Sequence, residues 1–344
     1  MRRDVRKAAL KSVLARKHTE AVLTPEQTQE FPTARPCGAR LVRVGAGDIQ
    51  LRVLIHRETV SDLRSLVIVN SIDFPMPPSF SFREQMWKAG YQVIFIERPG
   101  FGSSKPLPKI LLEDMQVKSG ATVAAEAALL LMLLNELQLK QIVLLGMGSA
   151  NPVCYRLAKL SAEVELAIFS NAMFNQDIWG VFRPNWFQGM LRQTVVSSAG
   201  LKFATYGVKH QLKKAPLKFY RDVLQKSAGD LRYLEENEDD FIWASQLIRN
   251  IDTATVSYDL RMSLGHDERL RDDFFAGINA VIMSGQETTD LWKSQMALEA
   301  ERLSLPVVYT PNGDLYAPYA SPDALLTTID DHSSVRQRLA RHGA

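Results

Sequence analysis

The sequence from 93 to 106 reads Val93-Ile94-Phe95-Ile96-Glu97-Arg98-Pro99-Gly100-Phe101-Gly102-Ser103-Ser104-Lys105-Pro106. Its first four residues are β-branched or aromatic, which is typical of a buried strand, and the glycines and proline that follow are typical of a turn. A Gly-x-Gly loop after a strand also occurs in dinucleotide-binding folds, but the third glycine and the acidic residue about twenty positions later are not convincingly in place. We therefore expect a buried strand and a tight turn here, not a nucleotide site.

Strand-like and helical runs alternate on both sides of this stretch. Helical segments such as Phe82–Ala89 and Val123–Leu137 separate apolar runs of strand length. Eight strands are predicted, at 40–44, 49–55, 66–69, 91–96, 142–145, 166–169, 280–283 and 306–309. Near-continuous apolar strands with helices between them indicate the α/β class, with a mostly parallel sheet covered by helices on both faces.

One interval, from Asn171 to about Asp267, is too long for a single crossover and contains amphipathic helical stretches. Because ligands of open α/β sheets bind outside the carboxyl ends of the strands, a helical insertion there is expected to form a cap. We predict a core formed by residues 37–170 and 268–344 and a cap formed by residues 171–267. The aromatic residues of the cap are expected either to line an apolar pocket or to pack the cap on the core: Phe174, Trp179, Phe182, Trp186, Phe187 and Tyr206.

Residues 1–36 carry most of the chain's basic character. The first twenty residues hold seven basic and two acidic side chains and so carry a net charge of +5. Since the whole chain carries +3, the remaining residues carry −2. Apolar spacing predicts an amphipathic helix over residues 1–23, and three prolines predict a linker over 24–36. The helix is expected to pack on its own domain or to contact a partner or an anionic surface. The near-neutral body gives no strong signal for nucleic acid.

The composition, with 46% hydrophobic and 23% charged residues among 344, is that of an ordinary soluble globular protein. Two cysteines, Cys37 and Cys154, cannot build a disulfide framework, which favours a cytoplasmic location. The longest apolar run, Ala127–Leu134, is far too short for a transmembrane segment, and we expect no secretory signal. No zinc-ligand spacing occurs, and we predict neither a metal nor a cofactor.

The order of these motifs resembles the α/β-hydrolase fold over about residues 40 to 330, with the insertion matching that family's cap. The stretch 93–106 is similar to the family's Asp-x-x-Gly-x-Gly-x-Ser loop, which implies structural roles for Glu97, Gly100 and Gly102. The strand at 66–69 is similar to the one that ends in His-Gly and supplies an oxyanion-hole N–H. The resemblance therefore implies a pocket or oxyanion region formed by Asn70, Ser71, Ile72, Ser149 and Ala150.

The nucleophile of this family lies on a strained strand-to-helix turn, usually Gly-x-Ser-x-Gly. Aligning Leu145-Gly146-Met147-Gly148-Ser149-Ala150 on the strand places Gly148 at the nucleophile position and Ser149 one residue later. A glycine offers no nucleophile, but it adopts the positive φ that the turn needs without steric cost. The turn can therefore keep its backbone shape although the residue at the nucleophile position has no reactive side chain.

The acid and base positions also depart from the pattern. Gly285-Gln286-Glu287-Thr288 places Thr288 where the acid belongs, with Asp290 displaced by two residues, and Pro311-Asn312-Gly313-Asp314 places Asp314 where the histidine belongs. None of the histidines directly follows the last strand, although His210 in the insertion could swing over the turn; we expect an exposed cap histidine instead. The six are His18, His56, His210, His266, His332 and His342.

Because the chain resembles the family but departs from it at all three triad positions, we expect a catalytically inactive protein, a pseudoenzyme with a ligand-binding, signalling or scaffolding role. Its expected partner is a small apolar ligand or a protein. One alternative is an esterase-like serine hydrolase that uses Ser149 as nucleophile with Asp290 as acid, although a serine without a base is a poor nucleophile. A second alternative is a membrane- or nucleic-acid-associated adaptor acting through the arm. We further expect the Asp314 carboxylate to cap the vacant turn at the start of the following helix.

Overall fold

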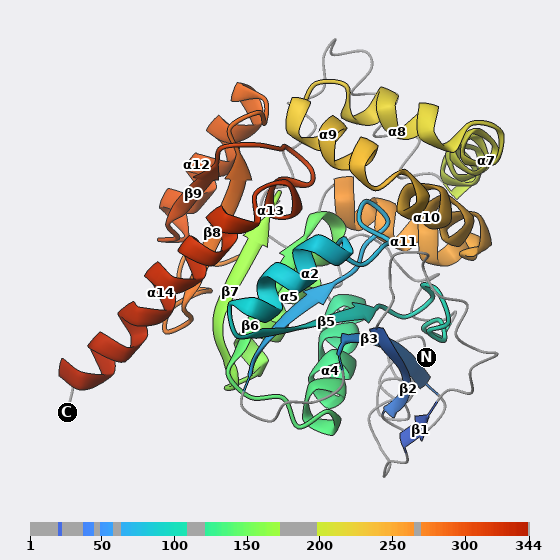
Figure 1. The fold of residues 1–344 in the computed structure, drawn as a ribbon. Helices are drawn as coiled ribbons and strands as arrows, with labels where there is room; N and C mark the ends of the chain where they lie inside the picture. Colours follow the sequence, from blue (N-terminus) through green and yellow to red (C-terminus); the bar gives the residue numbers. More distant parts are fainter. Residues whose placement is uncertain are drawn as a thin grey trace.

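A nine-stranded sheet forms the centre of the molecule (Figure 1). The structure, a computed structural model, describes residues 20–22, 37–44, 49–57, 63–108, 121–172, 198–264 and 270–342. The strand order is β1-β2-β3-β5-β4-β6-β7-β8-β9. The strands are β1 Glu20–Val22, β2 Cys37–Val44, β3 Ile49–His56, β4 Arg64–Val69, β5 Tyr91–Glu97, β6 Ile142–Met147, β7 Val164–Ser170, β8 Ala280–Gly285 and β9 Val307–Thr310.

The predicted eight-stranded, mostly parallel sheet is confirmed as β2 to β9. The six strands from β5 to β9 in the sheet order all run parallel to their neighbours, and β3 and β2 continue the sheet antiparallel. The ninth strand, β1, pairs antiparallel with β2. The predicted helix over residues 1–23 is therefore wrong at residues 20–22, where backbone hydrogen bonds to the sheet edge outweigh the helical pattern. Residues 1–19 and the linker 24–36 lie outside the described residues.

Both faces of the sheet are buried because successive strand residues point to opposite sides. In β4, Val67 and Val69 join one apolar cluster, whereas Leu66 and Ile68 join the other. The first cluster includes residues of α4, α5 and α12, and the second includes residues of α2 and α14. The bounds of these helices are α2 Phe80–Lys88, α4 Ala121–Glu136, α5 Asn151–Leu160, α12 Asp290–Arg302 and α14 Pro322–His342.

Local chemistry explains where several helices begin. The Ser79 hydroxyl accepts a hydrogen bond from the Phe82 N–H and caps α2, and the Ser227 hydroxyl accepts one from the Asp230 N–H and caps α9. A proline lies in the first turn of α5, where a missing N–H costs nothing. No helix in the described ranges is both long enough and apolar enough to span a bilayer.

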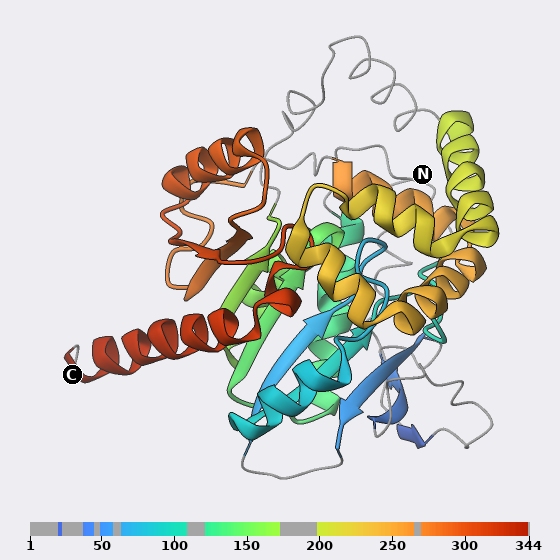
Figure 2. The same ribbon diagram turned by 45° about the horizontal axis from the view of Figure 1, so that its top comes forward.

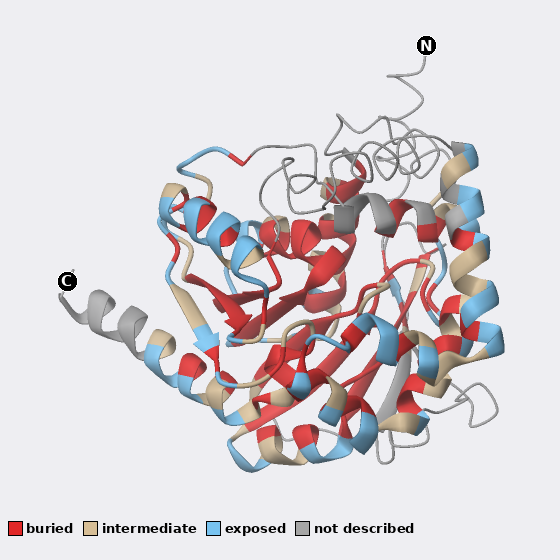
Figure 3. Cartoon of the chain, turned by 90° about the horizontal axis from the view of Figure 1, so that it is seen from above, coloured by how far each residue is buried: buried red, intermediate tan, exposed pale blue. Residues whose placement is uncertain are grey.

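In the described part of the chain between β7 and β8, five helices lie together over one end of the sheet (Figure 2). They are α7 Ser198–Lys214, α8 Pro216–Leu224, α9 Ala228–Glu236, α10 Glu238–Asn250 and α11 Thr253–Leu264, and the short α13 Ala317–Ala320 lies against α9. We call these five helices the cap; its division from the core at residues 171 and 267 stays a prediction. Figure 3 shows that buried residues fill the strands and the inner faces of the surrounding helices.

The aromatic residues predicted for the cap are only partly described. Tyr206, on α7, is 70% exposed, so it neither lines an apolar pocket nor packs the cap on the core, and both options are wrong for this residue. The other five predicted aromatic residues fall in 173–197, outside the described residues.

Candidate functional site

The carboxyl ends of β4 and β6 meet at the reversal point of the sheet. After β4 the chain adds β5 on one side, and β6 then pairs with β4 on the other. Loops at such a reversal point form the usual ligand crevice of an open α/β sheet. The loop after β4, which contains Asn70, Ser71 and Ile72, and the turn after β6 therefore lie at the same edge.

The turn after β6 has the backbone shape of a nucleophile elbow. Gly148 follows the strand directly with φ +51°, a 3₁₀ turn covers Gly148–Ala150, and α5 begins at Asn151. Ser149 and Ala150 are fully buried. The glycine supplies the left-handed conformation that other residues adopt only at a cost.

The space beside Gly148 is already occupied. A Cβ atom placed on Gly148 would lie 2.8 Å from the Asp73 Oδ2 and 2.9 Å from the Phe74 Cε2. Both distances are shorter than real Cβ contacts, so the loop after β4 has closed over the position where a nucleophilic side chain would start.

A carboxylate from the cap fills the space between the two loops. The Asp259 Oδ2, from α11, accepts hydrogen bonds from the Ile72 N–H at 2.6 Å and from the Ser149 hydroxyl at 2.5 Å. The Ser149 N–H points to a second carboxylate, with 3.4 Å between its nitrogen and the Asp73 Oδ2. Asp259 is fully buried, so no water competes for these donors at its surface.

Asp259 belongs to a buried ion network that joins cap and core. Its Oδ1 accepts from the Arg98 Nη1 at 2.6 Å, and Arg98 also donates through Nε and Nη2 to both oxygens of Glu126, at 2.6 and 3.2 Å. The Tyr258 hydroxyl donates to Glu126 at 2.6 Å. Burial acts against the charged guanidinium, but the Asp259 and Glu126 carboxylates outweigh it and raise the pKa of Arg98.

This network was not predicted from the sequence. Arg98 follows β5 and Glu126 lies on α4, while Asp259 and Tyr258 come from α11. One available signal was Glu126, the only acidic residue in the first fifteen of α4, in an otherwise apolar helix. Nothing local marked Asp259.

The residues at the predicted acid and base positions contact each other. The Thr288 hydroxyl donates to the Asp314 Oδ1 at 2.7 Å and accepts from the Ser284 hydroxyl at 3.2 Å. The carboxylates at the elbow are Asp73 and Asp259, so the prediction that Asp314 caps the elbow is wrong: its recorded hydrogen bond goes to Thr288 instead. Partial burial raises the pKa of Asp314.

The cap also holds the loop after β9. Asp230, on α9, accepts hydrogen bonds from the N–H groups of Asp314, Leu315 and Tyr316 at 3.1, 2.8 and 3.1 Å. From the loop after β8, the Glu287 Oε2 accepts from the Ser227 hydroxyl and from the N–H groups of Gly229 and Gly313. Two carboxylates therefore bind the loops that carry the acid and base positions to the start of α9.

Aromatic rings fill the space between the elbow and the loop after β9. Phe74 packs edge-on against Tyr316 with 4.9 Å between ring centroids, and Tyr233 stacks on Tyr316 at 5.5 Å. The Tyr316 hydroxyl donates to the Asp73 carbonyl at 3.0 Å. All three rings are buried, so this part of the cap–core contact is packed rather than hollow.

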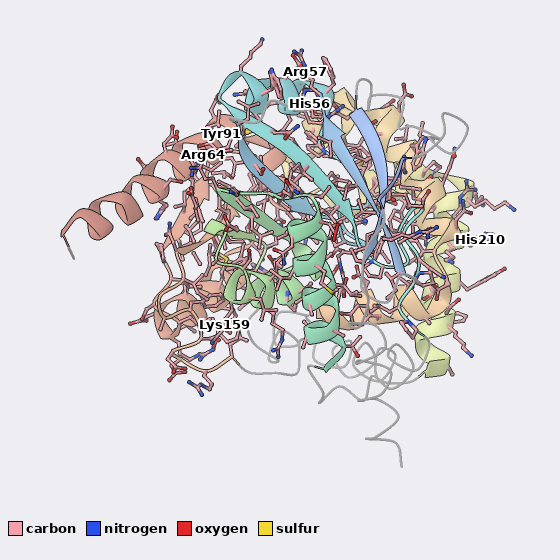
Figure 4. All side chains as sticks on the ribbon, turned by 90° about the horizontal axis from the view of Figure 1, so that it is seen from below. His56, Arg57, Arg64, Tyr91, Lys159 and His210 are labelled. Atoms are coloured by element: carbon pink, nitrogen blue, oxygen red, sulfur yellow. The ribbon has the colours of Figure 1, made fainter. Side chains whose placement is uncertain are left out.

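The other predicted participants lie elsewhere. Asp290, the alternative acid, is 99% exposed and pairs with Lys293. His210 is exposed on α7, stacked on Tyr206, and Figure 4 places it at the outer rim of the cap, so it does not cover the elbow. His56 is buried and bonds to Glu84 at 2.8 Å; burial lowers its pKa.

Among the described side chains, His332 and Cys154 form no further site. His332 is half-buried on α14; the side chain of His342 and the whole of His18 and His266 lie outside the described residues. Burial raises the pKa of the Cys154 thiol to about 12, so it is unreactive. Within the described residues, no group of three or more acidic, histidine or cysteine side chains could hold a metal ion.

Comparison with solved structures gives a consistent fold. The chain is similar to an esterase from Exiguobacterium antarcticum (12% identity, TM-score 0.56), covering 86% of this chain and 98% of that one. It is also similar to the Cif epoxide hydrolase from Acinetobacter nosocomialis, with 13% identity and a TM-score of 0.59 over 96% of this chain and 96% of that one. The enol-lactonase from Burkholderia xenovorans LB400 is similar too, with 14% identity and a TM-score of 0.54 over 86% of this chain and 99% of that one. The chain has the α/β-hydrolase fold.

No protein-family model and no curated protein matches the sequence. In the α/β-hydrolase fold, the oxyanion hole is formed by the N–H after the nucleophile and an N–H from the loop after the third strand of the conserved sheet. From the sequence we expect the N–H groups of Ser149 and Ile72 at these positions. The Ile72 N–H donates to Asp259 and the Ser149 N–H faces Asp73. Each of these two N–H groups thus points to a carboxylate of the chain itself.

Restoring the nucleophile should damage the fold instead of creating a site. We expect Gly148→Ser to lower the free energy of unfolding by about 2–4 kcal/mol, since it adds left-handed strain and a clash with Asp73 and Phe74. Gly277→Ser is the control, because Gly277 has φ +75° and open space around its Cβ position. Urea denaturation measures both; equal losses would show that the elbow has room for a side chain.

Removing the Asp259 carboxylate should destabilise the protein strongly. We expect Asp259→Ala to cost about 3–5 kcal/mol of unfolding free energy, because the buried Arg98 Nη1, the Ile72 N–H and the Ser149 hydroxyl all lose the acceptor that Asp259 provides. Asp222→Ala, an exposed carboxylate on α8, should change it by less than about 0.5 kcal/mol. A loss below about 1 kcal/mol for Asp259→Ala would contradict this account of the network.

The Asp230 contact should make stability depend on pH. Burial raises the pKa of Asp230 to about 6, although the hydrogen bonds from the three N–H groups act to lower this pKa. The folded chain therefore holds this proton more tightly than the unfolded chain, and the contribution of Asp230 to stability falls as pH rises from about 4 to 6. Urea titrations of the wild type and Asp230→Asn should diverge across this window by about 2–3 kcal/mol. Curves that stay parallel would refute the shift.

Proposed function

We propose that this protein is a non-catalytic member of the α/β-hydrolase fold, a pseudoenzyme that acts by binding, signalling or scaffolding. The observation that carries the proposal is the position of Asp259, whose Oδ2 accepts from both the Ile72 N–H and the Ser149 hydroxyl. A carboxylate oxygen there imitates the oxyanion of a reaction intermediate. The Ile72 N–H, which would stabilise a transition state in a hydrolase, and the Ser149 hydroxyl stabilise the folded chain instead by binding Asp259.

The same geometry argues against a Ser149 hydrolase. The Asp259 Oδ2 is the one hydrogen-bond acceptor at the Ser149 hydroxyl recorded within the described residues, and so the only candidate base. A substrate oxygen needs the Ile72 N–H that this atom occupies. If Asp259 leaves to admit substrate, Ser149 loses its proton acceptor; if Asp259 stays, the substrate is excluded. The two requirements of serine catalysis are therefore mutually exclusive at this site.

The packed aromatic rings above the elbow also limit where a ligand binds. Phe74, Tyr233 and Tyr316 are packed together above the elbow, which disfavours a small apolar ligand at that point under the cap. Contact with a partner protein is compatible with a cap fixed to the core by Asp230, Asp259 and Glu287. The adaptor role of the arm and the cytoplasmic location stay proposals from charge and cysteine content.

A fluorophosphonate probe tests the proposal directly, because it labels activated serines. We expect no labelling of the folded wild type, and hydrolysis of p-nitrophenyl acetate no faster than that of Ser149→Ala. Ser294→Ala, which removes an exposed serine on α12, is the matched control. An unrelated active serine hydrolase confirms that the reagents work. Labelling or turnover that disappears in Ser149→Ala and persists in Ser294→Ala would establish the hydrolase alternative.

A further inference from the structure

Two aromatic rings on the outer side of the cap are largely exposed to solvent. Phe203 is 78% exposed and Tyr206 is 70% exposed, and both belong to α7. They are the two most exposed large apolar side chains among the residues that the structure describes. Single exposed apolar residues are common on protein surfaces, but two bulky rings one turn apart on the same helix form a patch.

Lysine side chains flank the two rings on the same side of α7. With 3.6 residues per turn, six exposed residues of this helix fall within about 120° of its circumference, and the rings lie between the lysines. These residues are Lys202, Phe203, Tyr206, His210, Lys213 and Lys214, and we call them the α7 face. Figure 2 shows α7 along the outer edge of the cap, and Figure 4 places His210 at the rim.

The opposite side of α7 holds the helix against the rest of the cap. Thr205 and Leu212 are buried on that side, and α7 packs on α8, α10 and α11. Lys209, at the border between the two sides, donates a hydrogen bond to the Ile251 carbonyl at the end of α10. These contacts fix the orientation of α7, so the α7 face points outward.

The α7 face is basic, and its charge is not neutralised by the described part of the chain. α7 holds four lysines and no acidic residue. The three lysines of the α7 face have no ion pair among the described residues, whereas the basic side chains of α8 are paired, Lys218 with Asp222 and Arg221 with Glu238. A partner for the α7 face is therefore expected to carry negative charge.

Aromatic rings flanked by lysines are typical of a helix that lies on the surface of an anionic membrane. The rings enter the region between headgroups and acyl chains, while each ammonium group stays among the headgroups at the end of its apolar stem. The negative surface potential of such a membrane attracts the lysines. Because the α7 face is the outer side of a helix, a bilayer can meet it without a matching pocket.

A protein partner suits the α7 face less well. A helix that docks in a protein groove presents apolar anchors at positions i, i+3, i+4 and i+7. Starting from Phe203, the second anchor is Tyr206, but the third and fourth positions are Gly207 and His210. Two rings are few anchors for a groove, whereas binding to a membrane surface adds the attraction of the lysines to the apolar area that the rings bury.

We propose that the α7 face docks this protein reversibly on an anionic lipid membrane. The two rings enter the membrane interface, and the three lysines lie among the anionic headgroups. This inference does not depend on the absence of catalysis, because no residue of the α7 face belongs to the Asp259 network. Vesicle-binding assays and hydrolysis assays therefore succeed or fail separately.

Sedimentation of the full chain with lipid vesicles tests the docking. We expect binding to vesicles of about 30% phosphatidylglycerol in phosphatidylcholine, and at least about tenfold weaker binding to phosphatidylcholine alone. Binding to the anionic vesicles should also weaken at least about tenfold between about 50 and about 500 mM NaCl, because salt screens the attraction. No binding to the anionic vesicles would overturn the proposal and favour an acidic protein partner. Equal binding to both vesicles would also overturn it.

Two double variants test the role of the rings. Phe203→Ser with Tyr206→Ser should weaken binding to the anionic vesicles at least about tenfold, because the rings no longer enter the interface. Leu291→Ser with Leu298→Ser, which removes two exposed leucines of α12, should bind as the wild type does. Thermal melts show that the variants are folded. Binding that persists in the folded ring variant would place the contact elsewhere, such as in the basic residues 1–23, and refute this assignment.

A second pair of variants separates local charge from net charge. Lys213→Gln with Lys214→Gln should weaken binding to the anionic vesicles at least about tenfold. Lys88→Gln with Lys140→Gln removes the same charge at two exposed positions outside the cap and should change binding less than about twofold. Equal losses in the two double variants would show that net charge alone carries the binding, and would contradict docking through the α7 face.

Discussion

A single guanidinium, Arg98, lies fully buried between carboxylates from opposite sides of the molecule. Glu126, on α4, accepts from the Arg98 Nε and Nη2, and Asp259, on α11, accepts from its Nη1. Because buried donors are costly without acceptors, the cap is held to the core by these hydrogen bonds as well as by apolar packing. Once Asp259 is seated there, its second oxygen necessarily meets the Ile72 N–H and the Ser149 hydroxyl.

The elbow and the loops after β8 and β9 are held by contacts within the chain. The elbow keeps its left-handed residue, but Gly148 has Asp73 and Phe74 against it. The acid and base positions keep their proximity as a hydrogen bond between Thr288 and Asp314. In the non-catalytic protein that we propose, the Asp259 carboxylate accepts from donors that a hydrolase keeps for an oxyanion.

The elbow and Arg52 differ in how far their buried donors are paired. At the elbow, the Ile72 N–H and the Ser149 hydroxyl share one Asp259 oxygen. At Arg52, the Glu97 carboxylate accepts from Nη1, whereas Nε and Nη2 are buried without a partner in the described residues. Paired buried donors stabilise the fold, and unpaired ones lower its stability.

Eight of the strands and the glycine at the elbow could be predicted from the sequence, because hydrophobic periodicity and turn chemistry are local properties. The loss of the triad and the oxyanion role of Ile72 stay predictions. The contact of Asp259 with the Ile72 N–H, the pairing of Asp314 with Thr288 and the extension of the sheet by residues 20–22 came from the folded chain alone. These depend on contacts between segments far apart in the chain, where charge pairing and edge hydrogen bonds leave no local pattern. The unpaired edge of Arg52 follows from the same non-local geometry.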